Sequence, residues 1–196
     1  ALVDIFNKYE IGEVIEPAFP QTTSTYKKFL MAIEKNSISY RQAKEGMEIN
    51  AGDGVKIRVL APPEPFLENS RSDVNNASVV LHIQHGSMSF LFTGDIEAEM
   101  EDQLERQGDI QATVLKAPHH GGAHSSQDSF LDAVSPEFII ISCGEGNSYG
   151  HPAPSSIMRY RKAGAKIYRT DRVGTIKVIS DGRSIRVETE HGGGPA

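Results

Sequence analysis

Three apolar segments of the sequence each run into side chains that are able to bind a metal ion. The segments and the residues that follow them are 87–94 with Asp95, 112–117 with His119 and His120, and 138–141 with a glycine-rich loop that ends at His151. Carboxylate oxygens and imidazole nitrogens together suit zinc or manganese. The sequence therefore predicts a divalent-metal site at the ends of neighbouring strands.

The two adjacent histidines cannot both point in the same direction. One of His119 and His120 is therefore predicted to bind the metal, and the other to orient substrate or move protons. Two plainer alternatives stay open: an aspartate after Thr-Gly is commonly a turn or helix-cap residue, and a His-His-Gly loop need not bind anything. His82 and His85 lie within a strand-like segment and in a turn, so we expect them to be structural or solvent-exposed.

Helices are expected between these segments. Residues 96–107 repeat apolar side chains with a helical period and stop at Gly108. Two more helices are predicted, one after Ser126 and one over 154–163. Parallel strands joined through helices lie side by side, so the polar loops should meet along one edge of a sheet. With the mainly antiparallel strands expected before residue 87, this pattern predicts an α/β fold.

Composition and charge set further bounds. The chain has 196 residues, 38% of them hydrophobic, which suits one soluble globular domain. No apolar run of membrane-spanning length and no signal peptide are visible in it, and the lone Cys143 is expected to be a small core residue. The net charge is −6, yet residues 159–186 hold nine Lys or Arg against two acids. That segment is either a site for a phosphodiester or another anion, or an ordinary solvated face.

Four motifs carry a family resemblance. They are Phe-Leu-Phe-Thr-Gly-Asp at 90–95, Leu-Lys-Ala-Pro-His-His-Gly-Gly at 115–122, Asn-Ser-Tyr-Gly-His-Pro at 147–152 and Tyr-Arg-Thr-Asp-Arg-Val-Gly at 168–174. As a set they resemble the metallo-β-lactamase-type domain of ComEC competence proteins, the channel proteins of bacterial DNA uptake. The similarity extends from about residue 14 to residue 187.

The resemblance implies a metallo-β-lactamase αββα sandwich, with mixed sheets and helices outside, and a site for a divalent metal, zinc or manganese. It implies that Asp95 and His120 are metal ligands. His119 and His151 match motif positions to which we assign catalytic roles, assisting the leaving group or clamping a phosphate. The positions that we expect to contact substrate are Asn76, Ser125 and Arg169.

The sequence departs from the family pattern at its start. The main metal motif of the superfamily, His-x-His/Asp-x-Asp-His, is absent, and none of the seven histidines lies in such a pattern. We therefore expect a single domain over residues 1–190 that lacks its first part, followed by a disordered tail at 191–196. Because a hydrolytic centre needs about three or more protein ligands, metal is expected to be weakly bound or absent in this chain alone, which is then inactive.

By resemblance, the intact domain hydrolyses phosphodiesters in DNA during competence-linked uptake. The implied partners are DNA and the rest of a membrane channel protein. The implied location is a soluble domain of a bacterial inner-membrane protein, with no membrane insertion by this chain. Two alternatives stay open, because fold and metal ligands do not define the scissile bond. One is a binding or structural module without catalysis, and the other is a hydrolase of the same superfamily that acts on a small ester.

Overall fold

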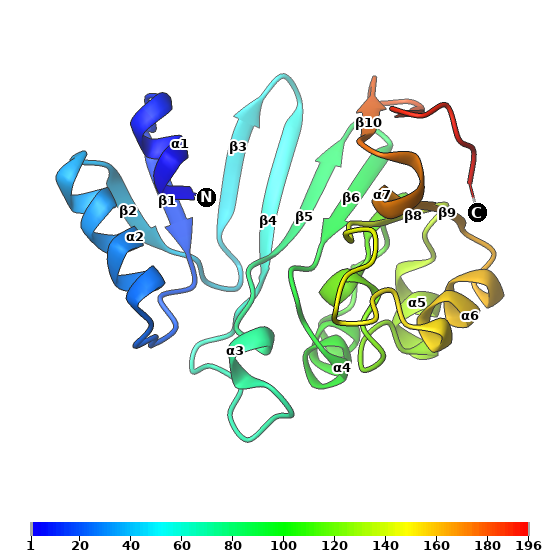
Figure 1. Ribbon diagram of the computed structural model, residues 1–196, viewed down its shortest axis with the longest axis horizontal. Helices are drawn as coiled ribbons and strands as arrows, with labels where there is room; N and C mark the ends of the chain where they lie inside the picture. The colour runs from blue at the N-terminus through cyan, green and yellow to red at the C-terminus, as the bar shows by residue number, and fades with distance from the viewer. Residues whose placement is uncertain (1, 196) are drawn as a thin grey trace.

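The computed structural model describes residues 2–195, and its centre is a seven-stranded mixed sheet in the order β3-β4-β5-β6-β7-β8-β9 (Figure 1). The strands of this sheet are β3 (Glu48–Gly52), β4 (Val55–Ala61), β5 (Val80–His85), β6 (Met88–Phe92), β7 (Val114–Lys116), β8 (Phe138–Ile141) and β9 (Lys166–Arg169). Strands β3 to β6 are antiparallel, whereas β6 to β9 are parallel. The sheet therefore changes character at β6, the strand that leads into Asp95.

Helices cover one face of the parallel half. They are α4 (Ala98–Gln107), α5 (Asp128–Val134) and α6 (Pro154–Lys162). Across the four parallel strands, the residues Leu91, Leu115, Ile139 and Ile167 stand in register and are at most 1% exposed. They form one hydrophobic core with helix residues that include Met100, Phe130 and Tyr160. Burial of this row fixes the register, because a slip of one residue would turn each side chain to the opposite face.

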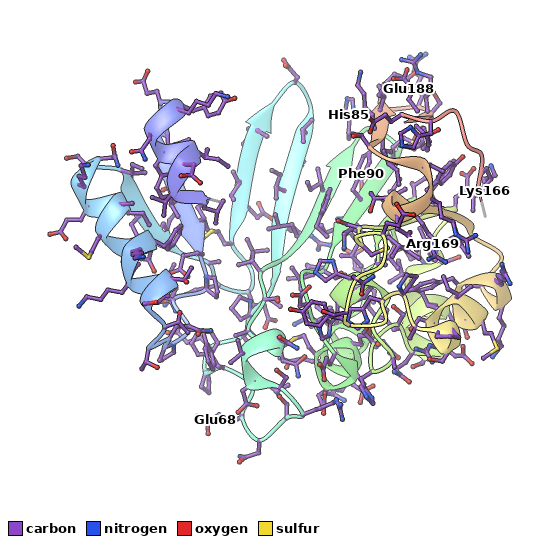
Figure 2. The ribbon with its side chains drawn as sticks, in the orientation of Figure 1. Glu68, His85, Phe90, Lys166, Arg169 and Glu188 are labelled. Carbon is purple, nitrogen blue, oxygen red and sulfur yellow. The ribbon has the colours of Figure 1, made fainter. Side chains whose placement is uncertain are left out.

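A hairpin lies over the other face of the sheet. It consists of β10 (Ile176–Ser180) and β11 (Ile185–Thr189), and its Ile176 and Val178 share a pocket of about 240 Å³ with Phe90 and Val114 of the sheet. The turn of the hairpin docks on the β5–β6 turn, where Ser87 N donates to Gly182 O at 2.8 Å. Figure 2 shows His85 beside this hairpin, and its Nδ1 lies 3.1 Å from Ser180 Oγ.

The first four elements form a separate unit at the opposite end of the molecule from α5 and α6 (Figure 1). They are α1 (Leu2–Lys8), β1 (Glu13–Glu16), α2 (Ser24–Lys35) and β2 (Ser39–Gln42), with β1 and β2 paired in parallel. Phe6, Ala32 and Ile33 give this unit its own small core. No helix within residues 2–195 has the length and apolarity that crossing a membrane requires.

The predicted α/β class, with mixed sheets and helices outside, is confirmed. The three strand ends that lead to Asp95, the histidine pair and His151 lie side by side, as predicted. Two one-turn helices were not predicted: α3 (Asp73–Asn76), inside the long polar loop, and α7 (Thr170–Val173), after β9. Single helical turns give too short a periodic pattern to be recognised in a sequence.

The limits of the predicted domain and tail stay predictions, because Ala1 and Ala196 lie outside the described residues. Within the described part of the tail, His191 N donates to Val173 O at 3.2 Å, and Gly193 O accepts from Thr189 Oγ1 at 2.9 Å. The first residues after β11 are therefore hydrogen-bonded to the end of the hairpin and to α7.

A buried carboxylate fixes the loop between the histidine pair and α5. Glu101 of α4 is fully buried and accepts hydrogen bonds from the backbone amides of Ser126 and Gln127. Ser126 Oγ and the Tyr160 hydroxyl lie 2.7 Å apart, and Arg159 Nε donates to Ser126 O at 2.7 Å. Helices α4 and α6 are thereby bonded to this loop, and Glu101, Ser126 and Tyr160 make their bonds fully buried from water.

We predict that Glu101 makes stability depend on pH. Burial raises the pKa of its carboxyl from an ordinary 4.5 to about 7, although the two amides and Arg159 oppose the shift. The folded state then holds a proton that the unfolded chain releases. The contribution of Glu101 to the free energy of unfolding should be fully present below about pH 4.5 and fall by on the order of 3 kcal/mol as the pH rises to about 7.

Urea unfolding followed by circular dichroism at a series of pH values measures this effect. Glu101→Gln should flatten the curve between pH 4.5 and 7, while Asp102→Asn, which changes an exposed acid on the same helix, should leave its shape unchanged. Two variants with the same pH dependence would exclude Glu101 as its source.

Candidate metal centre

His120 is held between a backbone carbonyl and a carboxylate. Its Nδ1 lies 2.6 Å from Ser142 O, and because a carbonyl only accepts, Nδ1 carries the proton of this bond. Nε2 of a neutral ring then presents a lone pair toward Asp95 Oδ1, 3.5 Å away. Two acceptors at this distance repel unless a positive charge, either a proton or a metal ion, lies between or on them. A carbonyl on the far nitrogen is also the usual partner of a metal-binding histidine.

The backbone of the histidine loop is in a rare conformation. This 3-10 turn, η1 (Pro118–Gly121), has φ values of 45° at His119, 55° at His120 and 78° at Gly121. Left-handed residues other than glycine cost about 1–3 kcal/mol each and collect at functional sites. The turn is fixed at both ends, since His119 N donates to Gly94 O at 3.1 Å and Ala153 N donates to Gly121 O at 2.9 Å.

His119 turns away from Asp95 and toward a second acid. Its Nδ1 lies 3.4 Å from Glu97 Oε1, and its ring meets that of His151 edge to face at 5.3 Å between centroids. The two adjacent histidines thus have different neighbours, in agreement with the prediction that they diverge. His120 is directed to the exposed Asp95, and His119 to a carboxylate of which only 5% is accessible.

Glu97 is the member of this cluster that the sequence analysis missed. Its side chain is buried, with Oε1 accepting from Asn75 Nδ2 at 3.1 Å and Oε2 3.2 Å from Arg71 Nε. That approach of Arg71 is not aligned as a hydrogen bond, so Oε2 has no hydrogen-bond partner among residues 2–195. The signal available in the sequence was the acid two positions after Asp95, which reads equally well as a helix-start residue.

His151 completes the cluster from the third strand end. Burial lowers the pKa of its imidazole, and so do the neighbouring rings of His119 and His120, while Asp95 opposes the shift. Its ring borders a pocket of about 460 Å³. The residues that line this pocket are His120, Ser142, Cys143, Gly144, Asn147, Tyr149 and His151.

The donor set fits part of a metal centre. Asp95 and His120 offer one oxygen and one nitrogen, with the imidazole tautomer fixed by Ser142 O. Within residues 2–195, no three His, Cys, Asp or Glu side chains converge closely enough to hold a metal ion. A catalytic zinc site usually has three protein ligands. Asp95 and His120 therefore fit two of the ligand positions of such a metal site.

Comparison with known proteins agrees with the motifs, although no family model matches the chain. The chain is 32% identical over 152 residues to ComE operon protein 3 of Bacillus subtilis, covering 77% of this chain and 19% of that protein. It is 37% identical over 127 residues to the competence protein ComA of Neisseria gonorrhoeae, covering 64% of this chain and 18% of that protein. The chain is related to competence proteins of the ComEC type. It spans about a fifth of the length of these relatives.

Two solved structures resemble the fold. One is described as a metal-dependent hydrolase from Parabacteroides distasonis, with a TM-score of 0.45 and 9% identity, covering 85% of this chain and 79% of that one. The other is described as a zinc-dependent hydrolase of the metallo-β-lactamase superfamily from Thermotoga maritima, with a TM-score of 0.33 and 14% identity, covering 66% and 57%.

The three residues predicted to contact substrate have other contacts in this ComEC-related chain. Asn76 is 1% exposed, and its Oδ1 accepts from Glu97 N at 2.8 Å. Ser125 is fully buried, and its Oγ donates to Pro118 O and Gly122 O. Arg169 forms a two-bonded ion pair with Asp171, which also accepts from Cys143 Sγ at 3.1 Å. Asn76 and Ser125 thus support the acid and the histidine loop, and Arg169 lies behind the wall of the pocket.

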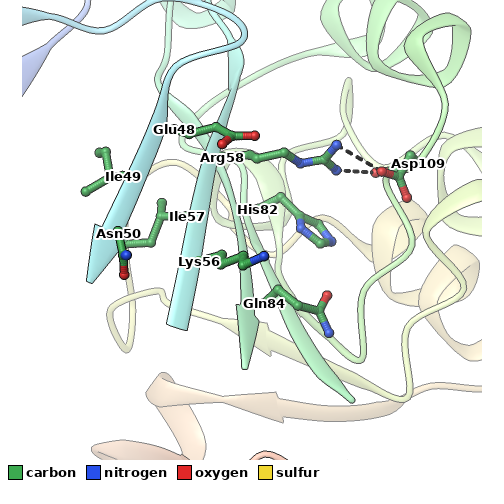
Figure 3. Close-up of a pocket in the computed structure, with 9 residues that line it drawn as sticks. All are labelled: Glu48, Ile49, Asn50, Lys56, Ile57, Arg58, His82, Gln84 and Asp109. Atoms are coloured by element: carbon green, nitrogen blue, oxygen red, sulfur yellow. Dashed lines mark hydrogen bonds and ion pairs between the residues drawn. The ribbon is translucent and has the colours of Figure 1, made fainter. Parts of the chain in front are cut away.

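A larger pocket, of about 550 Å³, lies elsewhere on the sheet (Figure 3). Polar side chains of β3, β4 and β5 line much of it. Two of its lining residues, Arg58 and Asp109, form an ion pair with 2.9 Å between Nη1 and Oδ2. His82 in this pocket lies 2.9 Å from Gln111 O, which precedes β7. The pocket therefore opens near the amino end of β7, away from the loop that carries the histidine pair.

Gly121 connects the loops of His120 and His151. It has φ +78°, and a Cβ added there would lie 2.8 Å from Pro152 Cβ. We predict that Gly121→Ala lowers the free energy of unfolding by about 1–3 kcal/mol and weakens metal binding. Gly54→Ala is the matched control, because Gly54 has φ +76°, close to that of Gly121, and a Cβ there would meet nothing within 4 Å. Denaturant unfolding measures both variants, and equal losses would mean that the Pro152 contact has no role.

Proposed function

We propose that this chain is part of a metal-dependent hydrolase that cleaves phosphodiester bonds in DNA during DNA uptake. The observation that carries the proposal is the pairing of Asp95 with His120, whose Nδ1 is bonded to Ser142 O and whose Nε2 faces the carboxylate at 3.5 Å. The relationship to competence proteins supplies the biological context.

Asp95 and His120 would hold the metal, with zinc and manganese as the candidates. A bound divalent metal would lower the pKa of a coordinated water to about 7 and so supply a nucleophile near neutral pH. Further ligands would have to come from outside residues 2–195 or from a rearranged cluster. This requirement makes weak binding the expectation for the chain on its own.

His119 and His151 would transfer protons to the leaving group or hold a phosphate of the substrate. Glu97 beside His119 Nδ1, at 3.4 Å, favours the tautomer with the proton on that nitrogen. Nε2 of His119 could then accept a proton from the attacking water and give it to the leaving oxygen. His151, whose pKa is lowered by burial and by its histidine neighbours, is favoured as a neutral ring that can share this task.

The basic segment 159–186 gives only limited support for DNA contact. Six of its nine Lys and Arg have partners within the described residues, namely Arg159, Lys162, Lys166, Arg169, Lys177 and Arg186. The three with no ion pair or side-chain hydrogen bond in that part of the chain are Arg161, Arg172 and Arg183. These three are the candidates for contacts to a DNA backbone.

The proposed setting is a soluble domain of a longer inner-membrane protein, with DNA and the rest of that protein as partners. A second candidate function is a binding module without catalysis. The incomplete ligand set within residues 2–195 favours it. Hydrolysis of a small ester is a third use of the same site, since the ligands do not select the scissile bond.

We predict that Mn²⁺ binding by this chain depends on the Asp95–His120 pair. Asp95→Asn and His120→Ala should each weaken the affinity by at least about tenfold, the equivalent of about 1.4 kcal/mol. His124→Ala is the matched control, because His124 is exposed in the same loop. Isothermal titration with Mn²⁺ and with Zn²⁺ measures the effect, and affinities that do not change in the first two variants would refute the assignment.

Cleavage is tested with a longer protein that contains this chain. End-labelled linear DNA and Mn²⁺ should give products with the unsubstituted protein and with His124→Ala, and at least about 100-fold fewer with Asp95→Asn. Metal binding without any cleavage would favour the binding module. Cleavage of a small ester, without cleavage of DNA, would favour an esterase function.

A further inference from the structure

Tyr149 is an aromatic side chain displayed at the mouth of the pocket beside the candidate centre. It is 81% exposed, more than any other large hydrophobic side chain in residues 2–195. Its ring is nearly parallel to that of His151, with centroids 6.0 Å apart and an interplanar angle of 19°. Both rings border the pocket that also contains His120. An exposed aromatic face therefore continues directly from the histidine cluster.

The loop that carries Tyr149 is fixed by one side chain. Asn147 Nδ2 donates to Gly144 O at 2.9 Å and to His151 O at 2.6 Å, and Asn147 Oδ1 accepts from His151 N at 3.0 Å. Both sides of the loop are thus bonded to a single amide, with Tyr149 between the bonded positions. The backbone on both sides of Tyr149 is therefore fixed, and the ring is exposed even though apolar surface in water costs free energy.

We propose that Tyr149 is the stacking platform for a nucleobase of single-stranded DNA. It would thereby determine the preference of the site for single strands over duplexes. This inference rests on the proposed phosphodiesterase function. A base on the open face of Tyr149 would extend the Tyr149–His151 stack, and the phosphate next to it would then be near His120. Stacking on aromatic rings is tolerant of sequence, because every base has a flat π-face.

The geometry favours a single strand over a duplex. A base in a duplex is already stacked and paired, so reaching Tyr149 would require its extrusion, at a cost of unstacking and unpairing. A single strand has bases free to stack on the ring. The platform therefore predicts that short single strands bind more tightly than duplexes of the same length.

The test measures binding separately from cleavage. Fluorescence anisotropy of a short labelled oligonucleotide is measured in the Asp95→Asn background, with three ligands: the single strand, its duplex, and a strand of the same length with abasic residues. Tyr149→Ala should weaken binding of the single strand by about tenfold and leave binding of the abasic strand nearly unchanged, while Tyr149→Phe should retain the affinity. Tyr9→Ala is the matched control, because Tyr9 is an exposed tyrosine between α1 and β1 of the N-terminal unit.

Equal losses for the normal and abasic strands, or no loss at all, would overturn the platform, as would undetectable binding of the single strand by the Asp95→Asn chain that keeps Tyr149. Circular dichroism of Tyr149→Ala establishes that the variant is folded. The proposed function can fail independently: stacking-dependent binding with no cleavage by the longer protein would refute the nuclease and keep the platform. Cleavage that does not depend on Tyr149 would support the nuclease and refute the platform.

Discussion

The position of His120 between Ser142 O and Asp95 is the constraint on which the rest of this site depends. The three groups come from the ends of three neighbouring parallel strands, β8 for the carbonyl, β7 for the imidazole and β6 for the carboxylate. Their meeting therefore requires the β6-β7-β8 order and its register. The left-handed turn at 119–121 then sends one histidine to each acid. A strained backbone of this kind persists only where its surroundings fix it, and here hydrogen bonds to Gly94 and from Ala153 do so.

The hydrophobic row beneath the site provides that fixed support. Leu91, Leu115 and Ile139 lie in register one strand apart and are fully buried under α4, α5 and α6. Their burial determines which residues end each strand, and hence which side chains project at the edge. The polar support is as deeply buried: Glu101 binds the amides at 126–127, and Ser125 Oγ binds two carbonyls of the histidine loop region. Hydrophobic register thus selects the positions, and buried hydrogen bonds keep the loops in place.

The sequence was sufficient to predict the strand ends, the helices between them and the approach of Asp95 to His120. These features follow from hydrophobic periodicity and from the right-handed connection of parallel strands. Contacts that depend on a single turn were not predictable in this way. Glu97 looks like any acid near the start of a helix, and only the fold reveals that it is buried against His119 and Asn76. Similarly, a serine in a polar loop gives no sign that it is fully buried, as Ser125 is.

The two acids of the cluster lie in different environments, and this difference suggests a division of labour. Asp95 is 44% exposed and faces an imidazole nitrogen that has no proton in the neutral ring, so its charge is available to a cation arriving from solvent. Glu97 is 5% exposed and has Arg71, Asn75 and His119 around it, so its charge is already compensated by the protein. A buried, compensated carboxylate orients its neighbours, whereas an accessible one can exchange ligands. A metal would therefore enter the site beside Asp95 and His120. Glu97 would fix the tautomer of His119, the proposed proton carrier.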